Sequence, residues 1–247
     1  MKKTVLVTGG AKGIGKATII EFAKKGYNVV VNYLTSQKEA YELVDEVGKY
    51  NVECLCIQAD VSKEDEVNLM FNKIEDKFGG VDILVNNAAI ELSNLFSNQT
   101  VEDFKKTLDV NLIGAYITSK RAYKHMIENK WGRIINISST NGINTYYPMC
   151  LSYDASKAAL ISLTHNLAVQ CAPYVNVNAI VPGFIGTETE LEYYDQDFLK
   201  SEEEKILLKR IGKPEEVAKL VLFLASDDAS YINNSIIRID GGQYGSN

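Results

Sequence analysis

Short runs rich in valine and isoleucine alternate with amphipathic stretches along almost the whole chain, and this alternation limits the folds that the chain can adopt. Strands of this kind, each followed by a helix, form parallel sheets that are covered on both faces. Because the crossovers are right-handed, the pattern predicts a doubly wound α/β fold with seven parallel strands, as a single domain over residues 1–247. The expected strands are 3–8, 27–32, 52–59, 81–85, 133–138, 175–181 and 236–239, and the expected helices are 13–25, 36–49, 63–78, 101–109, 112–129, 152–172 and 214–225.

The composition is that of a soluble globular protein, with 46% hydrophobic and 23% charged residues. A formal net charge of −6 argues against nucleic acid or an anionic membrane surface as the main partner. No apolar run approaches the length needed to span a bilayer, and residues 5–7 are too short an apolar run for a signal peptide. We therefore expect a cytoplasmic protein that binds neither nucleic acid nor membrane.

The cysteines and histidines do not suggest a metal site. Cys54 and Cys56 share one face of an expected strand, but no second pair of Cys or His completes a set of ligands. We expect no bound metal. We also expect these two thiols, together with Cys150 and Cys171, to be reduced and buried.

Residues 184–210 interrupt the alternation with an acidic stretch that also contains two adjacent tyrosines. A solvated helical excursion would have the same composition. However, the stretch directly follows an expected strand, and ligands of doubly wound folds bind at the carboxyl ends of strands. We interpret it as a mobile lid over a substrate.

A glycine-rich segment, Thr-Gly-Gly-Ala-Lys-Gly-Ile-Gly, joins the first expected strand to the first helix. Its glycines allow a tight turn close to a pyrophosphate, and the helix N-terminus adds unpaired N–H groups and the positive end of its dipole. The segment therefore predicts a dinucleotide site. The candidate contacts are Gly9, Lys12, Gly13, Ile14 and Gly15, with Asp60 and Val61 after the third strand and Asn87, Ala88 and Ala89 after the fourth.

The end of the second expected strand indicates which dinucleotide is bound. Sites for NAD usually carry Asp or Glu there to bind the ribose 2′-hydroxyl, whereas this chain has Asn32. Because this position carries no acid, a 2′-phosphate would not be repelled there. Lys12 is placed to pair with such a phosphate, although a solvated surface lysine is the alternative interpretation. The residues favour NADP over NAD.

Tyr153 and Lys157 are four residues apart at the start of an expected helix, and therefore lie on one face. A tyrosine with its ordinary pKa of roughly 10 is a poor acid or base at neutral pH, but a neighbouring cation favours the phenolate. Ser139, at the end of the preceding strand, is placed to hydrogen-bond a substrate oxygen. Tyr116 and Lys120 repeat the spacing without such a strand end, and we interpret that pair as packing and surface.

These motifs together resemble the short-chain dehydrogenase/reductase family of single doubly wound (Rossmann) domains, over nearly the whole chain. In that family the residue matching Tyr153 is the general acid/base, and the one matching Lys157 lowers its pKa and binds the nicotinamide ribose. Ser139 would position the carbonyl, and Asn111 would hold a water in the proton relay. The family is usually tetrameric, which implies a homotetramer. The matching segments are residues 8–15, 60–61, 86–89, 111, 132–139, 153–157, 182–187 and 240–242, in which Pro182, Gly183, Ile185 and Thr187 would line the nicotinamide and phosphate end.

One departure from the family pattern concerns the serine. The spacing from Ser139 to Tyr153 is one residue longer than in most relatives, which puts Thr140 at the usual distance. Anchoring the match on residues 132–137 favours Ser139, with a small insertion in the loop that includes residues 146–148.

Within the family, the length and the short C-terminus are most similar to the 3-oxoacyl-(acyl-carrier-protein) reductases, which reduce a 3-oxoacyl thioester with NADPH. The substrate would then be a small molecule or an acyl group on a carrier protein. Lys130 stands where a carrier-docking basic residue is expected, but residues 171–175 lack the second one. The presence of Glu91 directly after residues 86–90 is a similarity to the sugar dehydrogenases of the same family. A sugar, polyol or hydroxysteroid alcohol is therefore the alternative substrate. A non-catalytic dinucleotide-binding protein is less expected, because the catalytic set is complete.

Overall fold

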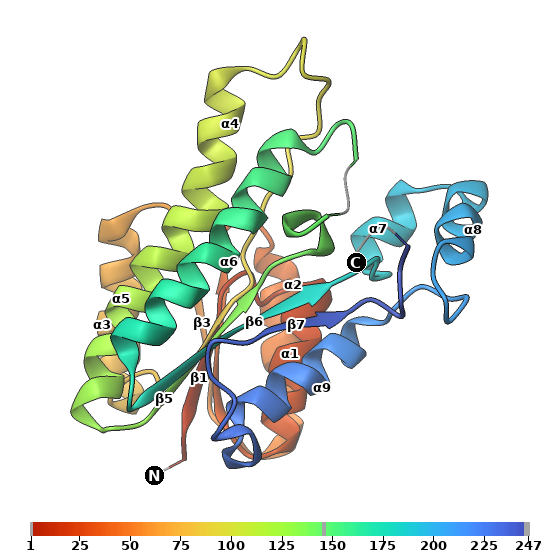
Figure 1. The fold of residues 1–247 in the computed structure, drawn as a ribbon. Coiled ribbons are helices and arrows are strands. Elements are labelled where there is room, and N and C mark those ends of the chain that lie inside the picture. Colours follow the sequence, from red (N-terminus) through yellow and green to blue (C-terminus); the bar gives the residue numbers. More distant parts are fainter. Residues whose placement is uncertain (1, 145–146, 245–247) are drawn as a thin grey trace.

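The computed structural model describes residues 2–144 and 147–244, so residue 146 of the expected insertion lies outside the described residues. It shows one parallel seven-stranded sheet with helices on both faces (Figure 1). The strands are β1 (Thr4–Val7), β2 (Asn28–Tyr33), β3 (Cys54–Gln58), β4 (Ile83–Asn86), β5 (Gly132–Ile137), β6 (Val175–Pro182) and β7 (Ile236–Ile239). The helices are α1 (Gly13–Lys24), α2 (Gln37–Val47), α3 (Glu64–Phe78), α4 (Val101–Leu108), α5 (Gly114–Glu128), α6 (Leu151–Cys171), α7 (Glu188–Tyr193), α8 (Gln196–Glu204) and α9 (Pro214–Ala225).

The predicted fold class is confirmed, and each predicted strand and helix is present with ends that differ by at most two residues. The helices α7 and α8 are additional, and both lie in the segment 184–210. Figure 1 shows them beyond the end of the sheet to which the strand arrows point.

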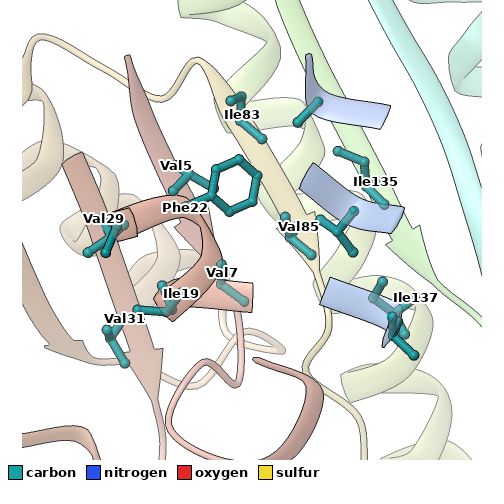
Figure 2. Close-up of a cluster of buried hydrophobic side chains, with 14 of the residues drawn as sticks. Val5, Val7, Ile19, Phe22, Val29, Val31, Ile83, Val85, Ile135 and Ile137 are labelled. Atoms are coloured by element: carbon teal, nitrogen blue, oxygen red, sulfur yellow. The ribbon is translucent and has the colours of Figure 1, made fainter. Parts of the chain in front are cut away.

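The alternation of side chains along each strand divides the core into two clusters. On β1, Val5 and Val7 pack on the face covered by α1, α2 and α9, whereas Leu6 packs on the face covered by α3, α5 and α6. Ile19 and Phe22 of α1 are fully buried in the first cluster (Figure 2). Full burial of one such side chain stabilises a fold by about 1.5–3 kcal/mol, so these contacts hold the glycine-rich turn before α1 in place.

The order of strands in the sheet is β3-β2-β1-β4-β5-β6-β7. Chain order reverses beside β1, which pairs with β2 on one side and β4 on the other. In doubly wound sheets a crevice forms at this reversal, outside the carboxyl ends of the strands. The loops after β1, β4, β5 and β6 therefore meet at one edge of the sheet.

Candidate active site

A pocket of about 420 Å³ lies at this edge of the sheet. Its walls include Glu91 from the loop after β4, Ser139 after β5, Tyr153 and Lys157 from the first turns of α6, and Phe184 after β6. The structure thus brings three of the predicted catalytic side chains to a single cavity, with Ser139 contributed by the segment after β5 and the other two by α6.

Lys157 is buried, and its Nζ lies 5.3 Å from the centroid of the Tyr153 ring. The same Nζ donates a hydrogen bond to the carbonyl oxygen of Ile137 at 2.9 Å. Burial lowers the pKa of Lys157 to about 8.

Burial also raises the pKa of Tyr153 above its ordinary value; the charge of Glu91 adds to this effect, and a hydrogen bond with Ser139 opposes it. From the sequence we expected the neighbouring lysine to lower this pKa. The removal of the phenolate from water is the larger effect, and Tyr153 keeps its proton at neutral pH.

Ser139 lies directly after β5 in extended backbone, with φ −162° and ψ 156°. Its hydroxyl hydrogen-bonds to the side chain of Tyr153. Thr140, the other residue considered for this position, begins a 3-10 turn over Thr140–Gly142 and is only 2% exposed. The geometry favours Ser139 as the hydroxyl that would meet a substrate oxygen beside Tyr153.

Asn111 lies in a π-helical turn, Asp109–Ile113, that joins α4 to α5. Its Nδ2 donates to the carbonyl oxygen of Ile90 at 2.9 Å and to Ser156 Oγ at 3.0 Å, and its Oδ1 accepts from the backbone N–H of Ile90 at 2.8 Å. These contacts hold the segment after β4 against α6. A wide turn of this kind is frequent at functional sites. The role in a water relay remains a prediction.

A second cavity, of about 630 Å³, adjoins the first, and Asn87 and Ala89 line both. Apart from Gly13 and Gly15, which line neither cavity, the predicted cofactor contacts divide between the two. Those lining the second cavity are Gly9, Lys12, Asn32, Asp60, Val61 and Ala88, and those lining the first are Ile14, Pro182, Gly183, Ile185 and Thr187, with Tyr153 and Lys157. The arrangement provides an extended cleft with a pocket at each end.

The glycine-rich turn fits a bound pyrophosphate. A Cβ on Gly15 would overlap the carbonyl oxygen of Gly9, so glycine alone permits this close approach, and Gly13 has a φ of +52°. The first turn of α1 contains no acidic residue, so its N–H groups and positive dipole end are available to an anion. Asn87 Nδ2 fixes the turn by donating to the carbonyl oxygens of Thr8 and Gly9, each at 3.0 Å.

Asn32 is buried, and its side chain is engaged within the protein. Its Nδ2 donates to the carbonyl oxygen of Ala59 at 3.0 Å, and its Oδ1 accepts from the backbone N–H of Gly9 at 3.3 Å. Asn32 therefore supports the glycine-rich turn, and the chain that follows it, from Tyr33 to Ser36, forms the wall of the second cavity.

Lys12 forms an ion pair with Glu39 of α2, with Nζ 2.7 Å from Oε1. The pKa of Lys12 is raised, chiefly by its hydrogen bond with Glu39. The sequence suggested a lysine that is free to pair with a phosphate. The structure shows instead that such a phosphate would have to compete with a carboxylate.

The segment 184–210 carries much of the pocket wall. Phe184, Tyr194 and Phe198 form an aromatic cluster, in which the rings of Tyr194 and Phe198 stack with centroids 4.2 Å apart. Glu202 of α8 is fully buried and accepts a hydrogen bond at 2.8 Å from the hydroxyl of Tyr147, which also lines the pocket. This contact joins the segment to the loop before α6.

Three residues in or beside the pocket, Glu190, Asn141 and Asp154, were missed in the sequence. Glu190 lines the cavity from α7, and burial together with the Glu91 charge raises its pKa. Asn141 and Asp154 form a hydrogen bond beside the catalytic hydroxyls. The only signal in the sequence was position along the chain: Asn141 is two residues after Ser139, and Asp154 directly follows Tyr153.

The expectation that the cysteines are buried is wrong for three of the four. All four are free thiols, but only Cys171 is buried, and Cys54 and Cys56 are half-buried on the edge strand β3. Cys150 lies in the pocket wall, where its Sγ donates to Glu91 Oε1 at 3.0 Å. Within residues 2–144 and 147–244, no group of three or more His, Cys, Asp or Glu side chains is placed to hold a metal ion.

Two other predicted residues lie away from the pocket. Tyr116, the tyrosine of the Tyr116–Lys120 pair, is 45% exposed on α5, as expected for a surface pair. Lys130 precedes β5, at the opposite end of the strand from Ser139, and its Nζ lies 6.0 Å from the centroid of the Tyr174 ring. Lys130 therefore does not contact a substrate in the pocket of its own chain.

Comparison with known proteins agrees with this geometry. The family model described as enoyl-(acyl carrier protein) reductase matches residues 9–243. The 3-oxoacyl-(acyl-carrier-protein) reductase FabG of Staphylococcus epidermidis is 38% identical over 99% of this chain and 100% of its own. The 3beta-hydroxysteroid dehydrogenase 1 of Eggerthella lenta is 39% identical over 97% of this chain and 93% of its own. The solved structure of ElxO with NADP bound is 38% identical over 98% of both chains, with a TM-score of 0.89.

The fold, the pocket and these matches define an NAD(P)-dependent oxidoreductase that acts on CH–OH groups. The chain belongs to the short-chain dehydrogenase/reductase family. None of the helices in the described part of the chain is long and apolar enough to cross a bilayer.

Proposed function

We propose that this enzyme uses NADP(H) to reduce a 3-oxoacyl thioester to the 3-hydroxyacyl thioester. The observation that carries the proposal is the meeting of Ser139, Tyr153 and Lys157 at a pocket continuous with the dinucleotide cleft. The full-length similarity to a 3-oxoacyl-(acyl-carrier-protein) reductase supports this substrate class.

The side chains of the pocket supply the proton chemistry of this reaction. A bound nicotinamide supplies the hydride for the carbonyl carbon. Tyr153, protonated at neutral pH, donates its proton to the carbonyl oxygen, and Ser139 donates a hydrogen bond to the same oxygen. The ammonium group of Lys157 beneath the ring then stabilises the phenolate that remains.

The wall of the second cavity supports NADP as the cofactor. No acidic residue occurs from Asn32 to Ser36. Thr35 and Ser36 line the cavity directly before α2, and the side chain of Ser36 makes no capping hydrogen bond to that helix. These hydroxyls and the positive end of the α2 dipole are suited to a 2′-phosphate, and the acid in the first turn of this helix, Glu39, is paired with Lys12. The relative solved with NADP bound supports the same assignment.

The ion pair of Lys12 with Glu39 gives a direct test of the cofactor assignment. We expect Lys12→Ala to weaken NADPH binding about tenfold, the usual loss for one charge-assisted hydrogen bond, and to leave NADH binding within about twofold. Glu39→Gln should have the opposite effect and tighten NADPH, because it removes a competing carboxylate. Dissociation constants from cofactor fluorescence measure both. Equal changes for the two cofactors would contradict a role of Lys12 at the 2′-phosphate.

The substrate is tested by following NADPH and NADH oxidation with acetoacetyl-CoA, the simplest soluble 3-oxoacyl thioester. We expect rapid turnover with NADPH and slow turnover with NADH. Absence of turnover, together with NADP⁺ reduction on a panel of sugars, polyols and hydroxysteroids, would contradict the proposed substrate and retain the family chemistry.

One observation favours the second candidate substrate, a hydroxylated ring or chain. Glu91 and Glu190 both line the pocket, and carboxylates are strong acceptors for substrate hydroxyl groups. The similarity to a hydroxysteroid dehydrogenase is in line with this alternative. The panel above separates the two candidates.

We propose a single catalytic domain in which residues 184–210 close over the substrate, with the contact between Tyr147 and Glu202 holding the closed form. The assignments of a homotetramer, of a cytoplasmic location and of a carrier protein as partner rest on similarity to the family. Because Lys130 lies far from the pocket of its own chain, a carrier that docks there would have to serve another subunit.

A further inference from the structure

Two hydrogen bonds connect the segments that carry the catalytic hydroxyls. Asn141 Nδ2 donates to Asp154 Oδ1 at 2.7 Å, a short distance typical of an ionised acceptor. On its other side, the backbone N–H of Asn141 donates to Ser139 Oγ at 3.2 Å. Asp154 directly follows Tyr153 on α6. The contact between Asn141 and Asp154 therefore joins the serine segment to the tyrosine segment.

The side-chain amide of Asn141 has one orientation that suits both neighbours. With Nδ2 toward the Asp154 carboxylate, Oδ1 faces Ser139 and accepts a long hydrogen bond from its hydroxyl at 3.4 Å. The reverse orientation would bring the carbonyl oxygen against a carboxylate, which is repulsive. A long, weak hydrogen bond such as this one is easily exchanged, so the serine hydroxyl can turn its hydrogen bond to a substrate oxygen.

The turn that carries Asn141 is closely packed against α6. A Cβ on Gly142 would lie 2.7 Å from the carbonyl carbon of Lys157. Ser138 Oγ also donates to the carbonyl oxygen of Lys157 at 2.9 Å. These contacts fix the backbone of the turn. The side-chain amide of Asn141 can still rotate, and the hydrogen bond with Asp154 determines its orientation.

We propose that Asp154 and Asn141 act as a positioning pair. The ionised carboxylate of Asp154 holds the Asn141 amide so that its oxygen faces Ser139, and this sets the direction of the hydroxyl that polarises the substrate carbonyl. The inference rests on the proposed ketone reduction at this site. Neither residue needs to touch the substrate.

The surroundings of Asp154 make this pair sensitive to pH. Burial, together with the charge of Glu91, raises the pKa of Asp154 to about 6, although the hydrogen bond from Asn141 opposes the shift. The other ionisable groups nearby are the Cys150 thiol and the adjacent Tyr153. Lys157 lies one helical turn further along α6, where its ammonium donates to the carbonyl oxygen of Ile137. Below this pH the protonated carboxyl accepts either orientation of the amide, and Ser139 loses its defined direction.

The test compares Asp154→Asn with the wild type and with Asp45→Asn, a matched change at an exposed aspartate of α2. For wild type and control, kcat/KM for the ketone should fall about tenfold from pH 7 to pH 5, that is, from one unit above to one unit below the pKa of about 6. Asp154→Asn should be about tenfold slower at pH 7 and change less than about twofold over this range. Glu91→Gln should move the fall to lower pH, because it removes one cause of the raised pKa.

A measurement without substrate separates this inference from the proposed function. The folded protein binds the Asp154 proton more tightly than the unfolded chain, so the stability that this group contributes decreases as pH rises from about 4 to about 6. Asp154→Asn should therefore melt at the same or a higher temperature than wild type at pH 8. A lower melting temperature, or a wild-type pH profile in this variant, would overturn the positioning role. Failure of acetoacetyl-CoA alone would contradict only the substrate, and the same pH comparison then uses the active alcohol or ketone of the panel.

Discussion

Tyr153→Phe is expected to lose nearly all turnover, about 10²–10⁴-fold, while its affinity for the dinucleotide stays within about twofold of wild type. The variant keeps the ring beside Lys157 and removes only the hydroxyl that donates the proton. Steady-state kinetics with NADPH, and cofactor binding by fluorescence titration, measure the two quantities separately.

The chain supplies a matched control for this prediction. Tyr116 has the same spacing to Lys120 on α5 as Tyr153 has to Lys157 on α6, but it is exposed and away from the pocket. Tyr116→Phe should keep wild-type activity. Full activity in Tyr153→Phe, or equal losses in both variants, would exclude Tyr153 as the proton donor.

Lys157→Met should reduce turnover by about 10²-fold or more, because the phenolate formed on Tyr153 would then be buried without a neighbouring cation. For the wild type we expect reduction to slow above pH 8, as Lys157 loses its proton near its pKa of about 8. Rates of Lys157→Met and of the control Lys120→Met, measured from pH 6 to pH 10, test this expectation.

The same lysine should affect stability. Its pKa is about 8 in the folded protein, against 10.5 for a lysine exposed to water, so the unfolded chain binds more protons between these values. The contribution of Lys157 to stability therefore rises with pH from about 8 to about 10.5, and Lys157→Met should lack this rise in thermal melts. An unchanged pH profile of both rate and stability in Lys157→Met would contradict a buried ammonium beneath Tyr153.

The architecture could be predicted from the sequence because its determinants are local. The Val/Ile-rich runs and the amphipathic stretches each specify one element, and right-handed crossovers limit how these elements join. The site could be located for the same reason. The glycines and Ser139 directly follow the ends of expected strands, Tyr153 begins the helix after Ser139, and these strand ends meet at one edge of the sheet.

What could not be predicted depends on distances between segments. The pairing of Lys12 with Glu39 joins the turn before α1 to the following helix, α2, and no local pattern distinguishes it from a solvated lysine. The raised pKa of Tyr153 depends on how deeply the ring is buried, which the i, i+4 spacing does not reveal. The hydrogen bond between Asn141 and Asp154 requires knowing that a 3-10 turn lies against the start of α6.

The tight packing of Gly142 against α6 has a consequence for how the pocket can diversify. The turn that follows Ser139 is fixed as far as this glycine, and the chain is next bound to the catalytic helix where α6 begins at Leu151. Between these anchors lies the loop that supplies Tyr147, Met149 and Cys150 to the pocket wall. Residues can therefore be inserted, deleted or exchanged in this loop while the hydroxyls of Ser139 and Tyr153 keep their positions relative to one another. Substrate preference can change by loop replacement on an unchanged catalytic frame, and directed evolution of this enzyme would begin in this interval.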